Sequence, residues 1–501
     1  MRGDNRKIPI RTKFYKQLIL FSFLLIFFKA SNLGLSPASE VYKREGNKVF
    51  IKIRTIKGKR GEIYDRNLIP LTLTLPDNYD WKRKYPFGWI TSNLIGFVNI
   101  DNEGVEGIEF EFNKILKGKD GKIELFRTAD GNYTVLPESK IIPPQNGSDI
   151  ILTIDIKIQK ICSEVLKEYA LKYRAKKGWV TVLNPQNGEI LALSSYPFFD
   201  PENFYNYTDE NYRNNNVQYL FEPGSVFKVL TAIFAIRHSK IKIDELFDVS
   251  KPIVIKDVII EDPEIEKKKK NEFTIEDIIV YSSNIGISKI SERCNTDELI
   301  NFAKKCGFGT PTGILFPGEG KGLIKKKMNK VDLLSFSFGQ GLLVTPLQIA
   351  LFYSAIANDG YLLHPIILKG ITKENKFKEF RSKIVVRKIF DNREIYIIKN
   401  FLRKVVEKGS GKKAKIEGLS ICGKTGTSQK VINGKYSKEL SVMSFVGFYP
   451  QENPNYLIYI GLDEPQNVRF SSEIIPEMFK KIVENIEAIN GENIYEIGGA
   501  I

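Results

Sequence analysis

Three short motifs follow one another in a fixed order along this chain of 501 residues. A serine with a lysine three residues later occurs at Ser225, a serine-x-asparagine triplet begins 57 residues further on at Ser282, and a lysine-threonine-glycine triplet begins at Lys424. If the motifs form one site, the fold has to bring together segments spread over the whole stretch from Ser225 to Lys424. This requirement constrains the fold more than any other feature of the sequence.

Ser225 is the candidate for a catalytic nucleophile. The serine-x-x-lysine spacing alone proves little, because it also occurs at Ser239 with Lys242 and at Ser410 with Lys413, where we expect no function. Ser225 differs because it follows a Pro-Gly pair and opens an apolar-periodic segment, which predicts a buried helix beginning at the serine. There the unpaired backbone N–H groups and the helix dipole favour negative charge on the serine oxygen.

Lys228 lies one helical turn after Ser225, so the two side chains share one face of the helix. A lysine with its ordinary pKa of about 10.4 is a poor base at neutral pH, but burial or a second cation disfavours its charged form. Lys424 is a candidate for that cation, and Lys228 could then accept the proton of the serine. The alternative interpretation is a serine N-cap followed by a solvated lysine, and only the other two motifs speak against it.

The second motif supplies two polar side chains, Ser282 and Asn284. It lies between a helical-looking run over 275–281 and a stretch of small and apolar residues over 285–287, which predicts a loop or a helix end. In the catalytic interpretation the Ser282 hydroxyl passes a proton between Lys228 and the leaving group, and the Asn284 amide holds a peptide group of the substrate. The alternative is an ordinary Ser/Asn turn.

The third motif combines a cation with hydroxyl groups and glycines. Lys424, with the hydroxyls of Thr425 and Thr427, forms a recognition site for a carboxylate. Gly426 and the glycine before Lys424 are typical of an edge strand whose backbone comes close to a ligand. The backbone N–H groups of Thr427 and Ser225 are candidates for an oxyanion hole. Taken alone the motif indicates a β-turn, and the order of all three motifs favours one site.

Together the motifs resemble the active-site set of class A β-lactamases and penicillin-binding proteins, in which the serine forms an acyl-enzyme. Further segments extend the resemblance over about residues 50 to 465 and indicate the class B penicillin-binding proteins. These segments are Arg60–Asn67, Gly107–Glu109, Leu116–Gly121, Leu152–Asp155 with Gln159, Ser195–Pro197, Tyr219–Ser225, Phe338–Gly341, Thr345–Gln348 and Phe445–Phe448.

The resemblance implies a monofunctional peptidoglycan DD-transpeptidase with a serine β-lactamase-like fold, in which Lys424 lies on an edge strand facing Ser225. The chemistry requires no cofactor and no metal ion. The serine in the second motif, the threonine after Lys424 and the compact N-terminal region resemble the septal, division-associated enzymes more than the elongation-type ones.

In the implied reaction, a stem peptide ending in D-Ala-D-Ala places its carboxylate on Lys424, Thr425 and Thr427. Ser225, deprotonated by Lys228, attacks the penultimate carbonyl and D-Ala leaves. The amine of a neighbouring stem peptide then takes the acyl group and closes a cross-link. β-Lactams are expected to acylate Ser225 as mimics of the dipeptide. A glycosyltransferase and division proteins are the expected partners.

Two other functions are compatible with the same residues. The first is hydrolysis of the acyl-enzyme by a carboxypeptidase or β-lactamase, although no glutamate can be assigned from the sequence as the deacylating base. The second is a β-lactam-binding sensor or scaffold without turnover. A sensor is disfavoured because only about 17 residues precede the first apolar run, which leaves little room for a cytoplasmic signalling segment.

The N-terminus predicts a membrane anchor. Basic residues gather before residue 17 and precede an apolar run over 18–28, and such residues stay on the cytoplasmic side. The run is short for a span of about 20 residues, so the alternative is a cleaved signal peptide. We expect an uncleaved, single-pass anchor in the bacterial inner membrane, with the catalytic domain on the outer face.

The net charge of +16 does not indicate nucleic-acid binding, because the lysines are scattered and no nucleic-acid-binding module is visible. The lysine runs 267–270 and 325–327 are interpreted as solvated charges, with anionic lipid or wall polymer as the alternative contact. The four cysteines lie far apart and indicate neither a disulfide framework nor a metal site. Cys422 is expected to be a small buried side chain rather than a reactive thiol.

Turn residues at 143–147 predict a domain boundary. Strand pairs are predicted around 179–193 and 442–462, followed by an amphipathic helix over 473–489. Strands at both ends with helices between them indicate an α+β domain, in which helices cover one antiparallel sheet. The predicted parts are a basic tail (1–16), a signal-anchor segment (17–34), a smaller mixed pedestal domain of the dimerisation type (35–148) and a penicillin-binding transpeptidase domain (149–501).

Overall fold

The computed structural model describes residues 10–77, 80–255, 258–262, 270–373, 376–380 and 383–498. Contacts within the chain divide it into two compact units. The smaller unit holds the chain up to Gly58 together with Lys119–Gln145, and the larger unit holds Lys59–Gly118 and everything from Asn146 onward. One boundary between the two units therefore falls at the turn residues 143–147, where the sequence predicts a domain boundary. The segment 59–118 groups with the larger unit, and the domain limits expected from the sequence stay a prediction.

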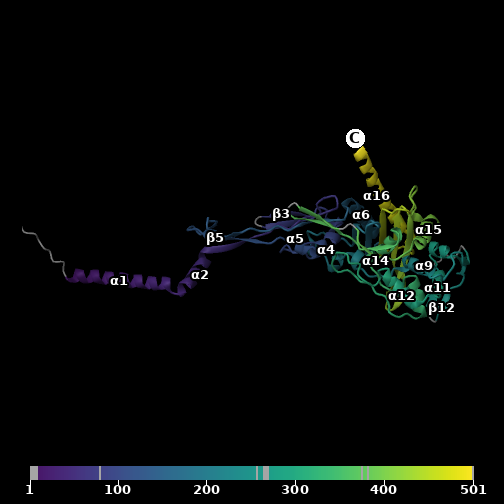
Figure 1. Cartoon of the computed structure of the whole chain (residues 1–501), viewed down its shortest axis with the longest axis horizontal. Helices are drawn as coiled ribbons and strands as arrows, with labels where there is room; N and C mark the ends of the chain where they lie inside the picture. The colour runs from purple at the N-terminus through teal and green to yellow at the C-terminus, as the bar shows by residue number, and fades with distance from the viewer. Residues whose placement is uncertain are drawn as a thin grey trace, which may run out of the picture. The chain divides into compact units, whose positions relative to one another are not determined.

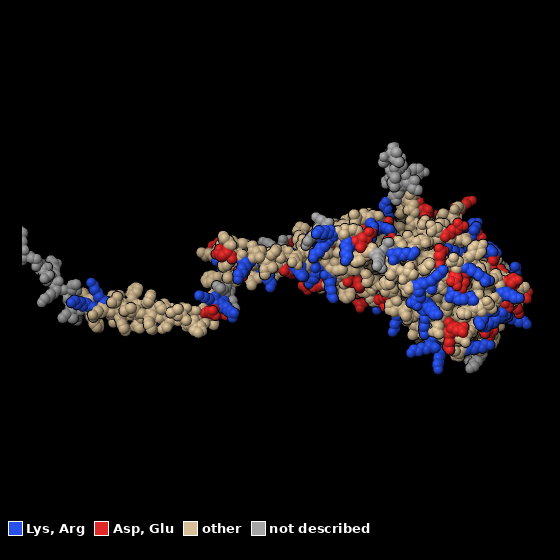
Figure 2. All heavy atoms as spheres, in the orientation of Figure 1, with Lys and Arg blue, Asp and Glu red and all other residues tan. Residues whose placement is uncertain are grey.

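A long apolar helix opens the described part of the smaller unit. Helix α1 (Ile10–Leu35) contains the 24-residue segment Thr12–Leu35, within which an 18-residue window has a mean hydropathy of 2.0 and is not buried. Figure 2 shows uncharged side chains along most of its length. It exceeds the apolar run 18–28 because flanking residues such as Phe14 and Tyr15 continue the helix. By length and composition, α1 can span a membrane, as predicted for the anchor.

A short helix and a small antiparallel sheet complete the smaller unit. Helix α2 (Ala38–Phe50) leads into β1 (Ile51–Ile56), which pairs with β5 (Gly121–Arg127). Strand β5 pairs in turn with β6 (Tyr133–Thr134) and β7 (Ile141–Ile142). The sheet thus joins the two sequence segments that make up this unit.

A five-stranded antiparallel sheet in the order β10-β9-β21-β20-β19 lies within the larger unit. Strands β9 (Lys177–Leu183) and β10 (Ile190–Tyr196) form the first predicted pair, and β20 (Lys435–Tyr449) and β21 (Tyr456–Asp463) form the second. Pairing of β21 with β9 joins the two ends of the domain. Strand β19 (Cys422–Ile432), which carries the third motif, is an edge strand, as predicted.

Side chains along the strands alternate between two hydrophobic cores, because successive residues of a strand point to opposite faces. Val180 lies in a core with α6 (Ile156–Lys172) and α16 (Ile475–Gly498), whereas Trp179 lies in the core that contains α9 (Lys228–Arg237). Figure 1 marks these helices around the sheet. One antiparallel sheet with helices over both faces confirms the predicted α+β architecture.

Two of the segments that carry the family resemblance are helix starts. Asp155 caps α6 by accepting hydrogen bonds from the backbone of the helix's first turn. Thr345 and Gln348 form a capping box around Pro346, the first residue of α14 (Pro346–Ala357). These side chains satisfy backbone N–H groups that have no partner inside the helix, so they fix where each core helix begins.

A buried ion-pair network organises the segment 59–118. Arg60 donates to Glu109, and Arg83 donates to both Glu109 and Glu62 over 2.7 and 3.0 Å. All four side chains are buried, and buried charges persist when they are paired in this way. The Arg60–Asn67 segment, which resembles the opening of a family domain, therefore supplies part of the local core.

Charged side chains of both signs are interspersed on the face of the larger unit in Figure 2. Lys325, Lys326 and Lys327 are exposed, and Lys325 pairs with Asp332 over 2.7 Å. This exposure fits solvated charges, and the alternative contact with anionic lipid or wall polymer is not tested by it. Most of the other run, 267–269, lies outside the described residues.

The remaining elements of the larger unit connect these parts. They are β2 (Ile63–Tyr64), β3 (Leu73–Asp77), β4 (Asp80–Lys84), η1 (Gly88–Ile90), α3 (Ser92–Ile95), α4 (Gly107–Glu111), α5 (Asn113–Leu116), β8 (Asp149–Leu152), η2 (Phe204–Asn206), α7 (Asp209–Tyr212), α8 (Asn215–Gln218), η3 (Gly224–Phe227), β11 (Phe247–Asp248), β12 (Ile253–Ile255), β13 (Val258–Ile260), β14 (Glu272–Phe273), α10 (Ile275–Val280), α11 (Asn284–Ser291), α12 (Thr296–Lys305), α13 (Lys330–Ser337), β15 (Tyr361–Leu363), β16 (Leu368–Lys373), β17 (Lys376–Glu379), β18 (Val385–Lys388), α15 (Asn392–Lys408), η4 (Lys412–Ala414) and η5 (Ser471–Glu473).

Candidate active site

Ser225 lies in a tight turn that leads into a buried helix. The turn is the 3-10 helix η3, and the α-helix proper, α9, begins at Lys228, three residues later than predicted. Gly224 has a φ of +59°, which glycine adopts readily, and its N–H donates to Gly339 O over 3.0 Å. The left-handed glycine explains why the chain enters the helix through a 3-10 turn. Ser225 itself stays partly exposed.

Two buried lysines converge on one hydroxyl. Lys228 Nζ donates to the backbone carbonyl of Ser282 and, over 3.2 Å, to Ser282 Oγ. Lys424 Nζ donates to the same Oγ over 2.8 Å. Both lysine side chains are fully buried. The structure therefore combines the two conditions that disfavour a charged lysine, burial and a nearby cation, around a hydroxyl that can pass a proton.

Ser282 occupies a strained position between two helices. It follows α10, precedes α11 and has a φ of +63°. A left-handed backbone at a residue other than glycine costs about 1–3 kcal/mol and persists only where its surroundings fix it. Here the next residue, Ser283, donates its N–H to Ile278 O over 3.0 Å. The predicted helix end is confirmed, and in this conformation Ser282 Oγ accepts hydrogen bonds from both lysines.

Strand β19 brings the third motif against the nucleophile segment. A Cβ added to Gly426 would lie 2.5 Å from Ser444 Oγ and 3.0 Å from Val226, and one added to Gly224 would lie 2.6 Å from Thr427 O. The protein's own packing thus favours glycine at Gly426. The expectation that this glycine also lets the backbone approach a ligand stays a prediction. The close approach places the backbone of Ser225 next to that of Thr427.

Each threonine of the third motif has a serine partner. Thr425 Oγ1 lies 2.7 Å from Ser410 Oγ, and either atom can be the donor. Thr427 Oγ1 donates to Ser471 Oγ over 3.0 Å and accepts from Ser471 N over 3.1 Å. Neither serine was a candidate from the sequence. The one available signal was that Ser410 lies between two glycines, which indicates a constrained turn.

A buried aspartate, also missed from the sequence, holds the second motif. Asp262 Oδ2 accepts from Ser283 Oγ over 2.7 Å, and its Oδ1 accepts from Ile285 N over 3.0 Å. The preceding residue, Glu261, accepts a hydrogen bond from Asn284 Nδ2 through its carbonyl over 2.9 Å. One N–H of the amide that was predicted to hold substrate is therefore used inside the protein. No sequence pattern connects 261–262 to this motif.

Glu222 links the nucleophile segment to the hairpin between β19 and β20. Its Oε1 accepts from Gly341 N over 2.9 Å and from Tyr436 OH over 3.3 Å, and its Oε2 is buried without a partner among the described residues. Burial raises the pKa of this carboxyl above its ordinary value, and the two hydrogen bonds oppose the rise. Glu222 is thus a titratable group three residues from Ser225.

Cys422 is buried at the start of β19, and its thiol donates to Lys399 O over 3.3 Å. Burial raises the pKa of this thiol to about 12, which suppresses its reactive form. All four cysteines are free and buried, as expected for structural side chains. Within the described ranges, no three histidine, cysteine, aspartate or glutamate side chains are grouped so as to hold a metal ion.

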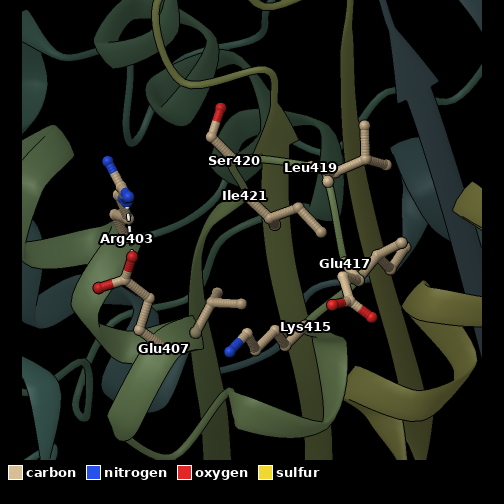
Figure 3. A pocket seen from close by; sticks show the side chains of 10 residues that line it. Arg403, Glu407, Lys415, Glu417, Leu419, Ser420 and Ile421 are labelled. Carbon is tan, nitrogen blue, oxygen red and sulfur yellow. Dashed lines mark hydrogen bonds and ion pairs between the residues drawn. The ribbon is translucent and has the colours of Figure 1, made fainter.

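A surface hollow of about 340 Å³ lies apart from this site. Figure 3 shows its lining, which comes from α15 and from the segment 415–421 that leads into β19. Arg403 and Glu407 pair across one turn of α15 at its rim, over 2.7 Å. No residue of the three motifs lines this hollow. The converging motifs, rather than the hollow, form the candidate active site.

Residues 178–484 match the family described as the penicillin-binding protein transpeptidase domain, and residues 77–152 match the penicillin-binding protein dimerisation domain. The chain belongs to the penicillin-binding protein transpeptidase family. The first match covers nearly all of the five-stranded sheet, helix α9 and all three motifs, whereas α6 lies before it. The family and the fold inferred from the sequence are thereby confirmed.

Known relatives agree with this family. The chain is 32% identical to stage V sporulation protein D of Bacillus subtilis, over 91% of this chain and 72% of the relative. It is 34% identical to the peptidoglycan D,D-transpeptidase FtsI of Buchnera aphidicola subsp. Baizongia pistaciae, over 90% and 77%. The crystal structure of penicillin-binding protein 3 from Mycobacterium tuberculosis is similar with a TM-score of 0.76 and 27% identity, over 88% of this chain and 98% of that one.

Proposed function

We propose that this penicillin-binding protein is a septal-type class B DD-transpeptidase that cross-links peptidoglycan stem peptides through an acyl-enzyme on Ser225. The observation that carries the proposal is the convergence of Lys228 and Lys424 on Ser282 Oγ. Relatives named peptidoglycan D,D-transpeptidase support the reaction, and those named FtsI support the septal role. The dimerisation-domain match supports a pedestal of that type.

Acylation begins when the terminal carboxylate of the D-Ala-D-Ala donor binds beside Lys424, Thr425 and Thr427. Ser225 Oγ attacks the penultimate carbonyl carbon while Lys228 Nζ accepts the serine proton. The carbonyl oxygen becomes an oxyanion that the N–H groups of Ser225 and Thr427 stabilise. As the C–N bond breaks, the leaving nitrogen takes up the proton through Ser282, and D-Ala departs.

Deacylation transfers the acyl group to an amine. The amine of a second stem peptide attacks the ester carbon and loses a proton through the same Ser282 and Lys228 pathway, and Ser225 Oγ is restored. Asn284 has a second N–H and a carbonyl oxygen besides the N–H that Glu261 uses, so it can still hold a peptide group. A β-lactam follows the first half of this path and remains as an ester on Ser225.

The apolar helix α1 supports a membrane-bound location for the enzyme. In our proposal residues 1–16 lie on the cytoplasmic side, 17–34 cross the inner membrane once, 35–148 form the pedestal and 149–501 form the transpeptidase domain on the outer face. A glycosyltransferase that supplies glycan strands and proteins of the division machinery are the proposed partners, because cross-linking needs newly made strands at the septum.

An acceptor-titration experiment separates the proposed reaction from its alternatives. The full chain in detergent is given a pentapeptide stem ending in D-Ala-D-Ala and rising concentrations of an amine acceptor, and D-Ala release and products are measured. We expect Ser225-dependent D-Ala release and a cross-linked share that rises with acceptor. Hydrolysed product alone would indicate a carboxypeptidase, and β-lactam binding without D-Ala release would indicate a scaffold or sensor.

A further inference from the structure

Ser410 belongs to a loop that contacts the third motif and the helix that precedes the second motif. The loop closes the end of α15, where Gly409 N donates to Val405 O and Gly411 N donates to the same carbonyl, each over 3.1 Å. Ser410 N lies 3.4 Å from Val280 O, two residues before Ser282. A Cβ on Gly409 would come 2.4 Å from that carbonyl. The glycine therefore lets the loop approach the second motif closely and fixes the position of Ser410.

The Ser410 hydroxyl is bonded to the third motif. Its Oγ lies 2.7 Å from Thr425 Oγ1, and either hydroxyl can supply the proton between them. The direction of this bond has a chemical consequence, because a carboxylate only accepts hydrogen bonds. If Thr425 donates to Ser410, it presents lone pairs to a bound carboxylate. If Ser410 donates, the proton of Thr425 can point to the carboxylate instead.

The other threonine of the motif, Thr427, uses its hydroxyl proton in a hydrogen bond inside the protein. Thr427 Oγ1 donates to Ser471 Oγ and accepts from Ser471 N, so its proton already has a partner inside the protein. Thr425 has no such fixed donor bond, since the geometry of its pair with Ser410 allows either hydroxyl to donate. The Thr425 hydroxyl can therefore direct its proton at a ligand, whereas Thr427 would first have to give up its hydrogen bond to Ser471.

We propose that Ser410 is a positioning residue for carboxylate recognition. It donates to Thr425 Oγ1 when substrate binds, which directs the Thr425 proton at the terminal carboxylate of the donor peptide beside Lys424. This inference rests on the proposed function of the site. It assigns to Ser410 part of the site's selectivity for ligands with a free carboxylate. It gives a function to Ser410, for which the sequence predicted none.

The test compares two ligands that differ only at the carboxylate, benzylpenicillin and its methyl ester. The rate constant for acylation of Ser225 by each is followed by mass spectrometry of the full chain for wild type, Ser410→Ala and Ser410→Thr. Ser420→Ala is the matched control, because Ser420 Oγ also takes part in one hydrogen bond, which it accepts from Gln451 N over 3.1 Å, but lies outside the motifs.

We expect Ser410→Ala to lower the rate with benzylpenicillin about three- to tenfold, the range that one net hydrogen bond supplies, and to leave the rate with the ester within about twofold. Ser410→Thr should restore the ratio of the two rates, and Ser420→Ala should not change it. An equal loss with both ligands, or no loss with either, would overturn the inference. A wild-type chain that forms no adduct with either ligand would instead overturn the proposed function.

Discussion

Lys424 Nζ lies 2.8 Å from Ser282 Oγ, although 142 residues separate the two in sequence. Because Lys228 donates to the same oxygen, Ser282 connects the helix turn that carries Ser225 to the edge strand that we propose binds the carboxylate. A change at any of the three motifs is therefore expected to disturb the other two.

Replacing Lys228 tests its function as the base. We expect Lys228→Met, which keeps the apolar stem, to lower the rate of acylation by a β-lactam by about 10²–10⁴, the usual contribution of a general base. Lys242→Met is the control, because Lys242 ends another serine-x-x-lysine sequence and is exposed. A Lys228→Met enzyme that acylates at the wild-type rate would show that another group accepts the serine proton.

Asp262 is expected to support the site without contacting substrate. Asp262→Ala removes both acceptors that hold Ser283 and the start of α11, so it should destabilise the chain by about 1–3 kcal/mol and slow acylation about tenfold. Asp262→Asn keeps one acceptor for Ile285 N, so its stability and acylation rate should fall between those of wild type and Asp262→Ala. Thermal unfolding and acylation rates measure these effects, and Asp244→Ala at an exposed site is the control. Equal acylation rates for all variants would show that Asp262 does not support the active site.

Glu222 is expected to make stability depend on pH. Burial raises the pKa of this carboxyl in the folded chain, so the unfolded chain releases the proton first and stability falls as pH rises from the ordinary carboxyl pKa through the raised one. Glu222→Gln removes this contribution. The melting temperature of the variant relative to wild type should therefore rise with pH over that interval and then level off. A difference that stays constant from pH 4 to pH 8 would contradict the raised pKa of Glu222. Glu417→Gln, at an exposed position, is the control for the substitution itself.

Cys422 is expected to resist alkylation in the folded enzyme, because burial raises the pKa of its thiol to about 12. Treatment with iodoacetamide at neutral pH, followed by peptide mass spectrometry, should leave Cys422 unmodified before unfolding and modified after it. Rapid labelling of the native chain at Cys422 would show that this end of β19 opens in solution.

The strand pairs and the edge position of Lys424 were predictable because they depend on local patterns. Alternating apolar residues mark β9 and β10, and the turn between them has a recognisable composition. The three motifs were predictable because each is a short run of residues with a fixed spacing. The resemblance to a known family then indicated that they meet in one site.

The supporting residues could not be predicted because their partners are distant in sequence. Asp262 lies 21 residues before Ser283 and Ser410 lies 15 residues before Thr425, and no local periodicity connects residues at these separations. The entry into α9 also depends on tertiary structure, since Gly224 takes its left-handed backbone where it bonds to Gly339. Local propensity alone favoured an α-helix from Ser225.

The most direct measurement is mass spectrometry of the full chain after exposure to a β-lactam, with peptide mapping and Ser225→Ala as the comparison. We predict one stable adduct that maps to Ser225 and is absent from the variant. An adduct that persists in Ser225→Ala, or one that maps to another residue, would contradict the assignment of Ser225 as the acylated nucleophile.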